Sequence, residues 1–290
     1  MGLKNTIQNV YEKEFKKLLI IPLLLFVLAV AQISFQVYST GDFVDRSVGL
    51  KGGVSITASQ GFLDVDKLSF DAKSFSPNAD IAVRSLRNTG EVIVEISDIS
   101  EDDIVKILDS QSVDRGSVVV EVTSSVVGGS FFRATMSALV LSFILMTIVV
   151  AISFRTFIPS LAVVLAAASD IVVTLAIFNI TGQKLTTAGI AAFLMLIGYS
   201  VDTDILLSTR ALKRKEGSFN DRIYSSIKTG LMTSFTTIIA VALALFIAKS
   251  ETIQQIMLII LIGMFVDIVN TWIQNVGILR WYHERRGGVV

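Results

Sequence analysis

The chain has 290 residues, of which 52% are hydrophobic and only 17% are charged, whereas soluble domains carry about 25% charged residues. Its 25 basic and 25 acidic residues cancel, so bulk charge predicts no nucleic-acid partner. The sequence has no cysteine and one histidine, His283, which excludes disulfides and argues against a zinc site. The composition therefore predicts a membrane protein without a metal or cofactor, and His283 is expected to be an exposed interfacial residue.

Six apolar segments are long enough to cross a bilayer, which takes about 20 residues in a helix. They cover residues 18–38, 134–154, 158–180, 188–208, 231–248 and 254–279. The first resembles a signal peptide with a cleavage site at Ala29-Val30-Ala31. Its apolar run continues to Val37, however, and this length favours an uncleaved helix.

Lysine and arginine mark the side of the membrane on which each loop lies. They are frequent in residues 1–17, in the loop after the fourth segment and in residues 280–290. The short loops after the third and fifth segments contain only Lys184 and Lys249. This asymmetry predicts that both termini are cytoplasmic and that residues 39–128 lie outside, with the other five helices within residues 129–279.

Residues 39–128 have the pattern of a compact α+β domain. Strands are predicted at 51–58, 80–86, 91–97 and 117–126, and helices at 63–75 and 101–112. Asn88-Thr89-Gly90 is typical of a hairpin turn, and Ser100 of a helix N-cap. The order β-α-β-β-α-β predicts a ferredoxin-like extracytoplasmic domain between helices 1 and 2. Its aspartates are expected to be solvated surface groups.

Four carboxylates lie within the apolar segments, namely Asp170, Asp202, Asp204 and Asp267. An ionised aspartate at the centre of a bilayer costs about 2.5–3.5 kcal/mol on insertion scales. Such residues usually face a protein interior or a water-filled path, so the four are candidates for a proton or ion relay. On a helix, Asp202 and Asp204 point about 200° apart, so at most one of them is expected to face a given neighbouring helix.

Polar residues on three segments are candidates for supporting these acids. The sixth segment places Asp267, Asn270, Thr271 and Gln274 on one helical stripe, and the fifth carries a threonine-rich run. Stripes on the fourth, fifth and sixth segments are expected to face one another. Arg210 is expected to reach phosphate headgroups or to neutralise an acid. The supporting candidates are Tyr199, Ser200, Thr233, Thr237, Asn270 and Arg210; the simpler alternative is that the Ser and Thr groups only join helices.

Several motifs together resemble one membrane-protein family. They are Gly52-Gly53, Val126-Val127-Gly128-Gly129-Ser130-Phe131, Gly198-Tyr199-Ser200-Val201-Asp202-Thr203-Asp204, Arg210 and Thr233-Ser234-Phe235-Thr236-Thr237. With the helix plan, they resemble the SecF subunits of protein export, in the resistance-nodulation-division superfamily. The resemblance covers nearly the whole chain, and the fourth-segment and fifth-segment motifs are specific when taken together.

The resemblance implies an accessory role in protein export across the cytoplasmic membrane. Its implied partners are a SecD-like subunit, a SecYEG-type translocon, exported preproteins and membrane lipids, and its implied energy source is the proton motive force. Bacterial relatives read Gly-Tyr-Ser-x-Asn-Asp-Thr where this chain has Asp202, Thr203 and Asp204, and they carry an arginine where Thr229 stands. The acids are thus displaced by one position, in an archaeal-like variant.

Three alternatives remain open at this stage. A half-transporter for lipids or hydrophobic solutes would share the architecture and the intramembrane acids. An intramembrane aspartyl protease could pair Asp202 with Asp267, although the expected Gly-x-Gly-Asp phrase is absent. A scaffold with permanently protonated acids is the third. No GxxxxGK[ST] loop occurs, and no enzymatic activity is expected.

Overall fold

The computed structural model describes residues 11, 14–59, 64–76, 79–86, 90–97, 101–110, 118–213 and 216–286. The sheet domain contains α4 (Val48–Lys51), β1 (Gly53–Ser59), α5 (Val65–Phe75), β2 (Asp80–Leu86), β3 (Glu91–Ser97), α6 (Glu101–Ser110) and β4 (Val118–Thr123). The helical part contains α2 (Phe15–Leu18), α3 (Ile20–Thr40), α7 (Ser125–Phe154), α8 (Phe157–Ile180), α9 (Thr187–Lys213), α10 (Phe219–Ile247), α11 (Glu251–Val269), the π-helix η1 (Asn270–Asn275) and α12 (Val276–Arg285).

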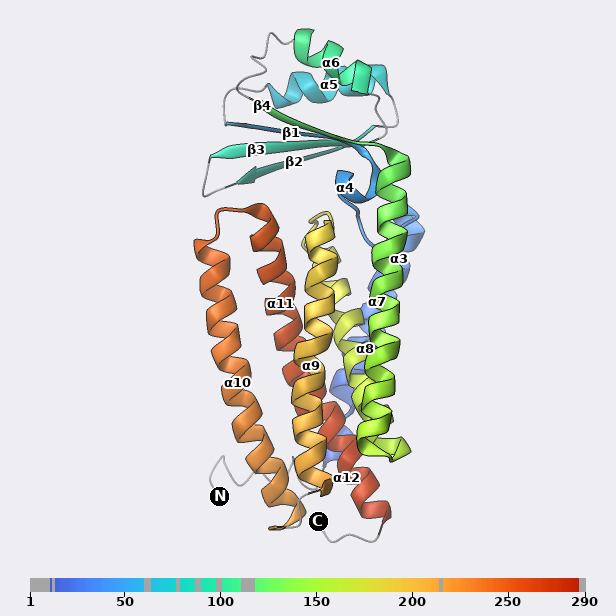
Figure 1. Cartoon of the computed structure of the whole chain (residues 1–290), viewed down its shortest axis with the longest axis vertical. Coiled ribbons are helices and arrows are strands. Elements are labelled where there is room, and N and C mark those ends of the chain that lie inside the picture. The colour runs from blue at the N-terminus through green and yellow to red at the C-terminus, as the bar shows by residue number, and fades with distance from the viewer. Residues whose placement is uncertain are drawn as a thin grey trace.

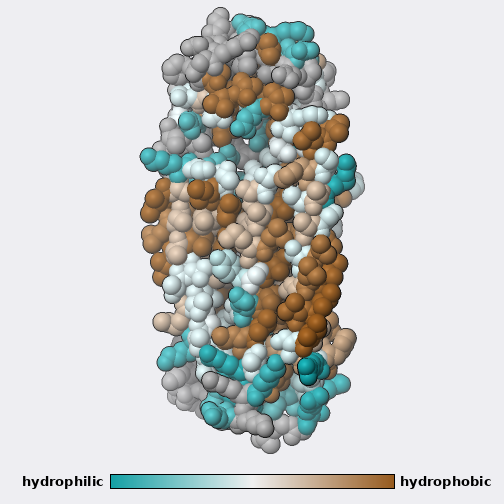
Figure 2. All heavy atoms as spheres, viewed as in Figure 1, coloured by the Kyte–Doolittle hydropathy of each residue, from teal (hydrophilic) through white to brown (hydrophobic). Residues whose placement is uncertain are grey.

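Six helical stretches of the described chain are long and apolar enough to cross a membrane. They are Phe15–Thr40, Ser125–Phe154, Phe157–Ile180, Thr187–Lys213, Phe219–Ile247 and Glu251–Arg285. They run side by side below a small sheet (Figure 1), and hydrophobic residues form a belt around them with hydrophilic residues at both ends (Figure 2). The chain is a multi-pass membrane protein.

Three of the six spans form the centre of the bundle. At least half of the most apolar window is buried in α8, in α9 and in the last span, whereas most of α3, α7 and α10 faces outward. Leu196 of α9 and Ile259 of α11 are fully buried in the largest apolar cluster. Residues on the inner three helices are therefore the ones that the fold can enclose.

The sheet domain has a four-stranded antiparallel sheet in the order β2-β3-β1-β4. Alternation along β1 places Val54, Ile56 and Ala58 in its core, as a sheet with one covered face requires. Helices α5 and α6 cover the face that points away from the bundle (Figure 1). Strands β2 and β3 have the predicted bounds, and the predicted order of strands and helices is confirmed.

Several predicted boundaries are wrong. Strand β4 ends at Thr123 and not at 126, because α7 begins at Ser125. Helix α10 begins at Phe219 and so extends beyond the predicted span of residues 231–248. A capping box between Ser218 and Asp221 starts α10 before its apolar run begins. Such a cap satisfies the free N–H groups of the first turn, so the helix can begin outside the apolar segment. The predictions at residues 63, 111–112 and 117, the Asn88-Thr89 turn and the Ser100 cap lie outside the described residues.

The sheet joins the bundle through a contact between glycines. Gly52 has φ +97°, and a β-carbon there would lie 2.3 Å from Cα of Ser125. On the other side, a β-carbon at Gly128 would lie 2.9 Å from the Gly52 nitrogen. The Gly52-Gly53 pair and Gly128 thus let the start of β1 and the first turn of α7 touch through their backbones.

A second link ties the sheet to the loop between α8 and α9. Lys184 Nζ lies 2.9 Å from Oδ2 of Asp80 on β2. Next to it, the Leu185 N–H donates to the Asp45 carbonyl, and the Leu185 carbonyl accepts from the Ser47 N–H. Burial alone would raise the pKa of Asp80, but the hydrogen bond from Lys184 and the charges of Lys184 and Lys51 bring this pKa below its ordinary value. Asp80 is thus an exposed group, as the sequence predicts, that also bonds to Lys184.

Replacing Lys184 with methionine is expected to loosen this link. The Asp80 side chain is 53% exposed, so the lost free energy is at most about 1 kcal/mol. Hydrogen exchange should accelerate in β2 and in the loop of residues 181–186. Because the pKa of Asp80 is lowered in the fold, the wild-type link should weaken in the same way as pH falls through that pKa.

The matched control is Lys106→Met, which removes an exposed pair with Asp103 on α6. It should leave exchange in the loop of residues 181–186 unchanged. Equal acceleration by both substitutions would show that the Lys184 bond does not fasten the sheet to the bundle.

Candidate functional site

Three of the four predicted carboxylates meet in the centre of the bundle. Asp170 comes from α8, Asp204 from α9 and Asp267 from α11, and each is at most 1% exposed. Buried carboxylates are costly unless they are protonated or hydrogen-bonded. Their shared burial among the three inner helices makes them the candidate site.

Amide and hydroxyl groups hold two of these carboxylates. Asp170 accepts a hydrogen bond from the Ser200 hydroxyl and one of 2.7 Å from Nδ2 of Asn270. Oδ1 of Asp204 accepts from Nδ2 of Asn275 at 2.7 Å and contacts Oγ1 of Thr271 at 2.9 Å. The network therefore joins α8, α9 and the last span through side chains.

The π-helix η1 supplies the polar half of this network. A π-turn inserts an extra residue into a helix and often occurs at functional sites. Here Asn270, Thr271 and Asn275 are buried, whereas Gln274 is only half-buried. The prediction that Gln274 continues the polar stripe is wrong. In the wider π-turn the residue that faces inward after Asn270 is Asn275.

The hydroxyl of Thr271 bridges two of the acids. Its Oγ1 lies 2.9 Å from Oδ1 of Asp204 and 3.0 Å from Oδ1 of Asp267. A hydroxyl has one hydrogen to donate, which can go to either oxygen or be shared between the two in a three-centre bond. Thr271 thus links Asp204 and Asp267 through a single hydroxyl.

Several polar atoms around the site are buried without a partner. Among the described residues, Oδ2 of Asp204, Oδ2 of Asp267 and Oδ1 of Asn275 have no hydrogen-bond donor. The hydroxyls of Ser169 and Ser208 are also buried without a partner. An unpartnered buried carboxylate oxygen is costly when the group is ionised. No three Asp, Glu, His or Cys side chains of the described residues are placed to hold a metal ion.

Asp202 lies apart from this site. It is exposed on α9, as is Tyr199, whereas Asp204 is fully buried, so the prediction that Asp202 and Asp204 point in different directions is confirmed. Asp202 is not placed to share a proton with Asp267, which removes the geometric basis of the aspartyl protease alternative.

The threonines of α10 do not face the acids. Thr233 and Thr236 are exposed and Thr237 is half-buried. Their hydroxyls bond to carbonyls one turn earlier on the same helix, that of Thr237 to Thr233 and that of Thr233 to Thr229.

The predicted meeting of polar stripes is confirmed for the fourth and sixth segments. On the fifth segment only Ser234 of the polar run is fully buried. The third segment contributes Asp170 to the network.

Arg210 and His283 also differ from expectation. Nη1 of Arg210 bonds to Oγ1 of Thr229 at 2.8 Å and to the Ser225 carbonyl at 3.0 Å, so this side chain joins α9 to α10 instead of reaching headgroups or an acid. His283 is half-buried, and its ring stacks on Phe219 with centroids 4.2 Å apart. It is thus a packing residue rather than an exposed one.

Comparison with known proteins covers nearly the whole chain. The family described as "Protein export membrane protein SecD/SecF, C-terminal" matches residues 104–285. The SecF of Pyrococcus furiosus is 35% identical over 99% of this chain and 97% of its own length. That of Methanolacinia petrolearia is 35% identical over 96% of this chain and 97% of its own length. The chain belongs to the SecF family.

Two solved structures share the fold. The crystal structure of SecDF, described as a translocon-associated membrane protein from Thermus thermophilus, matches with a TM-score of 0.74 at 20% identity over 94% of this chain. SecDF in its super-membrane-facing form matches with a TM-score of 0.62 at 19% identity over 96% of the chain. This chain spans only 38% and 39% of those two chains.

Proposed function

We propose that the chain is an accessory subunit of Sec protein export, which assists preprotein translocation across the cytoplasmic membrane beside a SecYEG-type translocon. The full-length similarity to SecF proteins carries this proposal. The buried acids supply the coupling: Asp204 and Asp267 load and release protons driven by the proton motive force. The burial of both acids around the Thr271 hydroxyl supports protons as the coupling ion, because a buried carboxyl is neutralised more readily by a proton than left ionised.

The proposed topology has both termini in the cytoplasm and a ferredoxin-like domain outside. The α-helical ends farthest from the sheet carry Lys213, Arg222 and Arg286, and basic residues favour the cytoplasmic side. The β-α-β-β-α-β order and the strand order β2-β3-β1-β4 support the ferredoxin-like assignment.

A SecD-like subunit is the proposed partner, and it would cover the exposed polar face of α9 and α10. This face consists of Tyr199, Asp202, Thr229, Thr233 and Thr236. Figure 2 shows a paler zone over α10 and the adjoining part of α9 that interrupts the hydrophobic belt. Leaving Asp202 in lipid would cost about 2.5–3.5 kcal/mol, and a protein neighbour removes that cost.

Proton flux tests the coupling role. The chain, reconstituted with its SecD-like partner in vesicles, should conduct protons when a potential is applied. Replacing Asp204 and Asp267 together with asparagine should lower this flux by about a hundredfold, within the range that one proton-transferring group contributes. A pH-sensitive dye inside the vesicles measures it, and asparagine keeps the volume and the hydrogen bonds of the site.

Asp202→Asn is the matched control, since it removes an acid from the same helix at nearly the same depth. It should leave flux within about twofold of wild type if the path runs through the buried acids. Flux lost with Asp202→Asn and kept in the double variant would place the path at the partner-facing surface. Failure to co-purify with a SecD-like subunit would contradict the pairing itself.

A further inference from the structure

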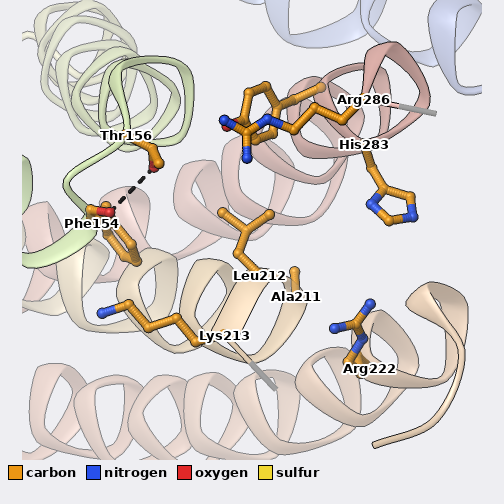
Figure 3. A pocket seen from close by; sticks show the side chains of 9 residues that line it. Phe154, Thr156, Ala211, Leu212, Lys213, Arg222, His283 and Arg286 are labelled. Carbon is orange, nitrogen blue, oxygen red and sulfur yellow. Dashed lines mark hydrogen bonds between the residues drawn. The ribbon is translucent and has the colours of Figure 1, made fainter. Parts of the chain in front are cut away.

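A cavity of 490 Å³ opens at the end of the bundle farthest from the sheet. Four segments that are distant in sequence line it (Figure 3). Phe154 comes from the end of α7, Lys213 from the end of α9, Arg222 from the start of α10, and His283 from α12. Its volume lies within the range of small-molecule sites.

The charged groups that line the cavity are all basic. Lys213, Arg222 and Arg286 contribute cations, His283 contributes an imidazole, and no carboxylate lies among the described lining residues. Two acids that neighbour them in sequence are engaged elsewhere. Asp221 accepts a hydrogen bond of 2.7 Å from the Ser218 hydroxyl, and Oε2 of Glu284 lies 3.8 Å from Nζ of Lys16. Among the described lining residues, no carboxylate offsets the charges of Lys213 and Arg286, and these two cations give the cavity a positive potential.

Aromatic and backbone contacts hold these basic groups in place. Lys213 Nζ bonds to the Ser153 carbonyl at 2.9 Å and lies 5.4 Å from the centre of the Phe154 ring. The Arg286 guanidinium lies 4.8 Å from the centre of the Tyr282 ring. A ring contact uses the flat face of a guanidinium and leaves its N–H edge for an anion, and an ammonium has three donors. The site is thus preorganised for an acceptor with several oxygens.

The depth of the cavity indicates where such an acceptor comes from. The hydrophobic belt of the bundle ends just above this level, where hydrophilic residues begin (Figure 2). Phe154 and Leu212 give the cavity an apolar wall beside its basic groups. Basic pockets between helices at this level suit the headgroups of anionic lipids. We propose that the cavity binds the phosphate of an anionic phospholipid, which fastens α7, α9 and α12 to one another.

Lipid titration of the purified full chain in a neutral detergent tests the proposal, because no charged membrane surface is then present. Phosphatidylglycerol should bind as a retained molecule in native mass spectra and should raise the Tm, whereas phosphatidylcholine should not. Replacing Lys213 and Arg286 together with glutamine should weaken phosphatidylglycerol binding by about tenfold or more.

The control pair is Lys228→Gln with Arg285→Gln, which removes two exposed cations from α10 and α12. It should leave the affinity within about twofold. The Tm of each variant without lipid establishes that it folds. Equal loss with both pairs would overturn the proposal. If inorganic phosphate raised the Tm as much as phosphatidylglycerol does, the assignment to a lipid would be overturned in favour of a soluble anion.

Discussion

Alanine in place of Gly53 is expected to unfold the four-stranded sheet or to prevent the chain from accumulating. Gly53 has φ +133°, and a β-carbon there would lie 2.3 Å from the Ile96 carbonyl oxygen and 2.8 Å from Cα of Ser97. Both neighbours belong to the backbone of β3, which pairs with β1. Strain at such φ values costs about 1–3 kcal/mol, and overpacking costs about 1–3 kcal/mol more. Loss of hydrogen-exchange protection in β1 and β3 would measure the effect.

Gly90→Ala separates the two causes. Gly90 also has a positive φ of +68°, but no atom lies within 4 Å of a β-carbon there. The substitution should cost only about 1–2 kcal/mol, from conformation alone. If exchange in β1 accelerated equally in both variants, the close contact with β3 would not matter.

Alanine in place of Gly230 is expected to push α10 away from the last span. A β-carbon at this position would lie 2.3 Å from Cζ2 and 2.6 Å from Cη2 of Trp272. The Trp272 side chain is 5% exposed and packs in the cluster that contains Leu279 and Ile223. The ring cannot move without displacing its neighbours, so the expected loss of stability is about 1–3 kcal/mol. Thermal unfolding in detergent measures it.

A smaller ring should rescue this variant. Trp272→Phe removes the ring atoms that the added β-carbon would meet, so the double variant should be more stable than the two single effects predict, by about 1 kcal/mol or more. Gly198→Ala is the control, because a β-carbon there meets nothing within 4 Å on the exposed face of α9. That change should be neutral or stabilising by about 0.5–1 kcal/mol. Additive effects at Gly230 and Trp272 would contradict the contact.

Local patterns predicted the parts of the fold that depend on near neighbours. Alternation and turn residues locate β2 and β3 to the residue, since the two strands form one hairpin. Hydropathy located the six spans but not the ends of α7 and α10, because it marks the hydrocarbon-facing part of a helix and not its full length. Ser125 and Phe219 begin these helices through contacts and caps that lie outside the apolar runs.

The candidate site was only partly predictable for a related reason. Residue type alone identified Asp170, Asp204 and Asp267, because a carboxylate in an apolar segment is rare. A constant period of 3.6 residues could not place Asn275, which faces inward only because η1 is wider than an α-helix. Arg280 was predicted to be one of the basic residues of the cytoplasmic C-terminus. It is instead fully buried, with its guanidinium 5.1 Å from the centre of the Tyr11 ring.

The continuity of α7 has a mechanical consequence. This helix starts against Gly52 at the root of the sheet and ends at Phe154 in the basic cavity. Its 30 residues form a rod about 45 Å long. A rod of this length acts as a lever arm, so a tilt of about 5° at the sheet displaces its far end by about 4 Å. Reorientation of the sheet domain would therefore translate the far end of α7 on the opposite side of the bundle, without any change within the helix.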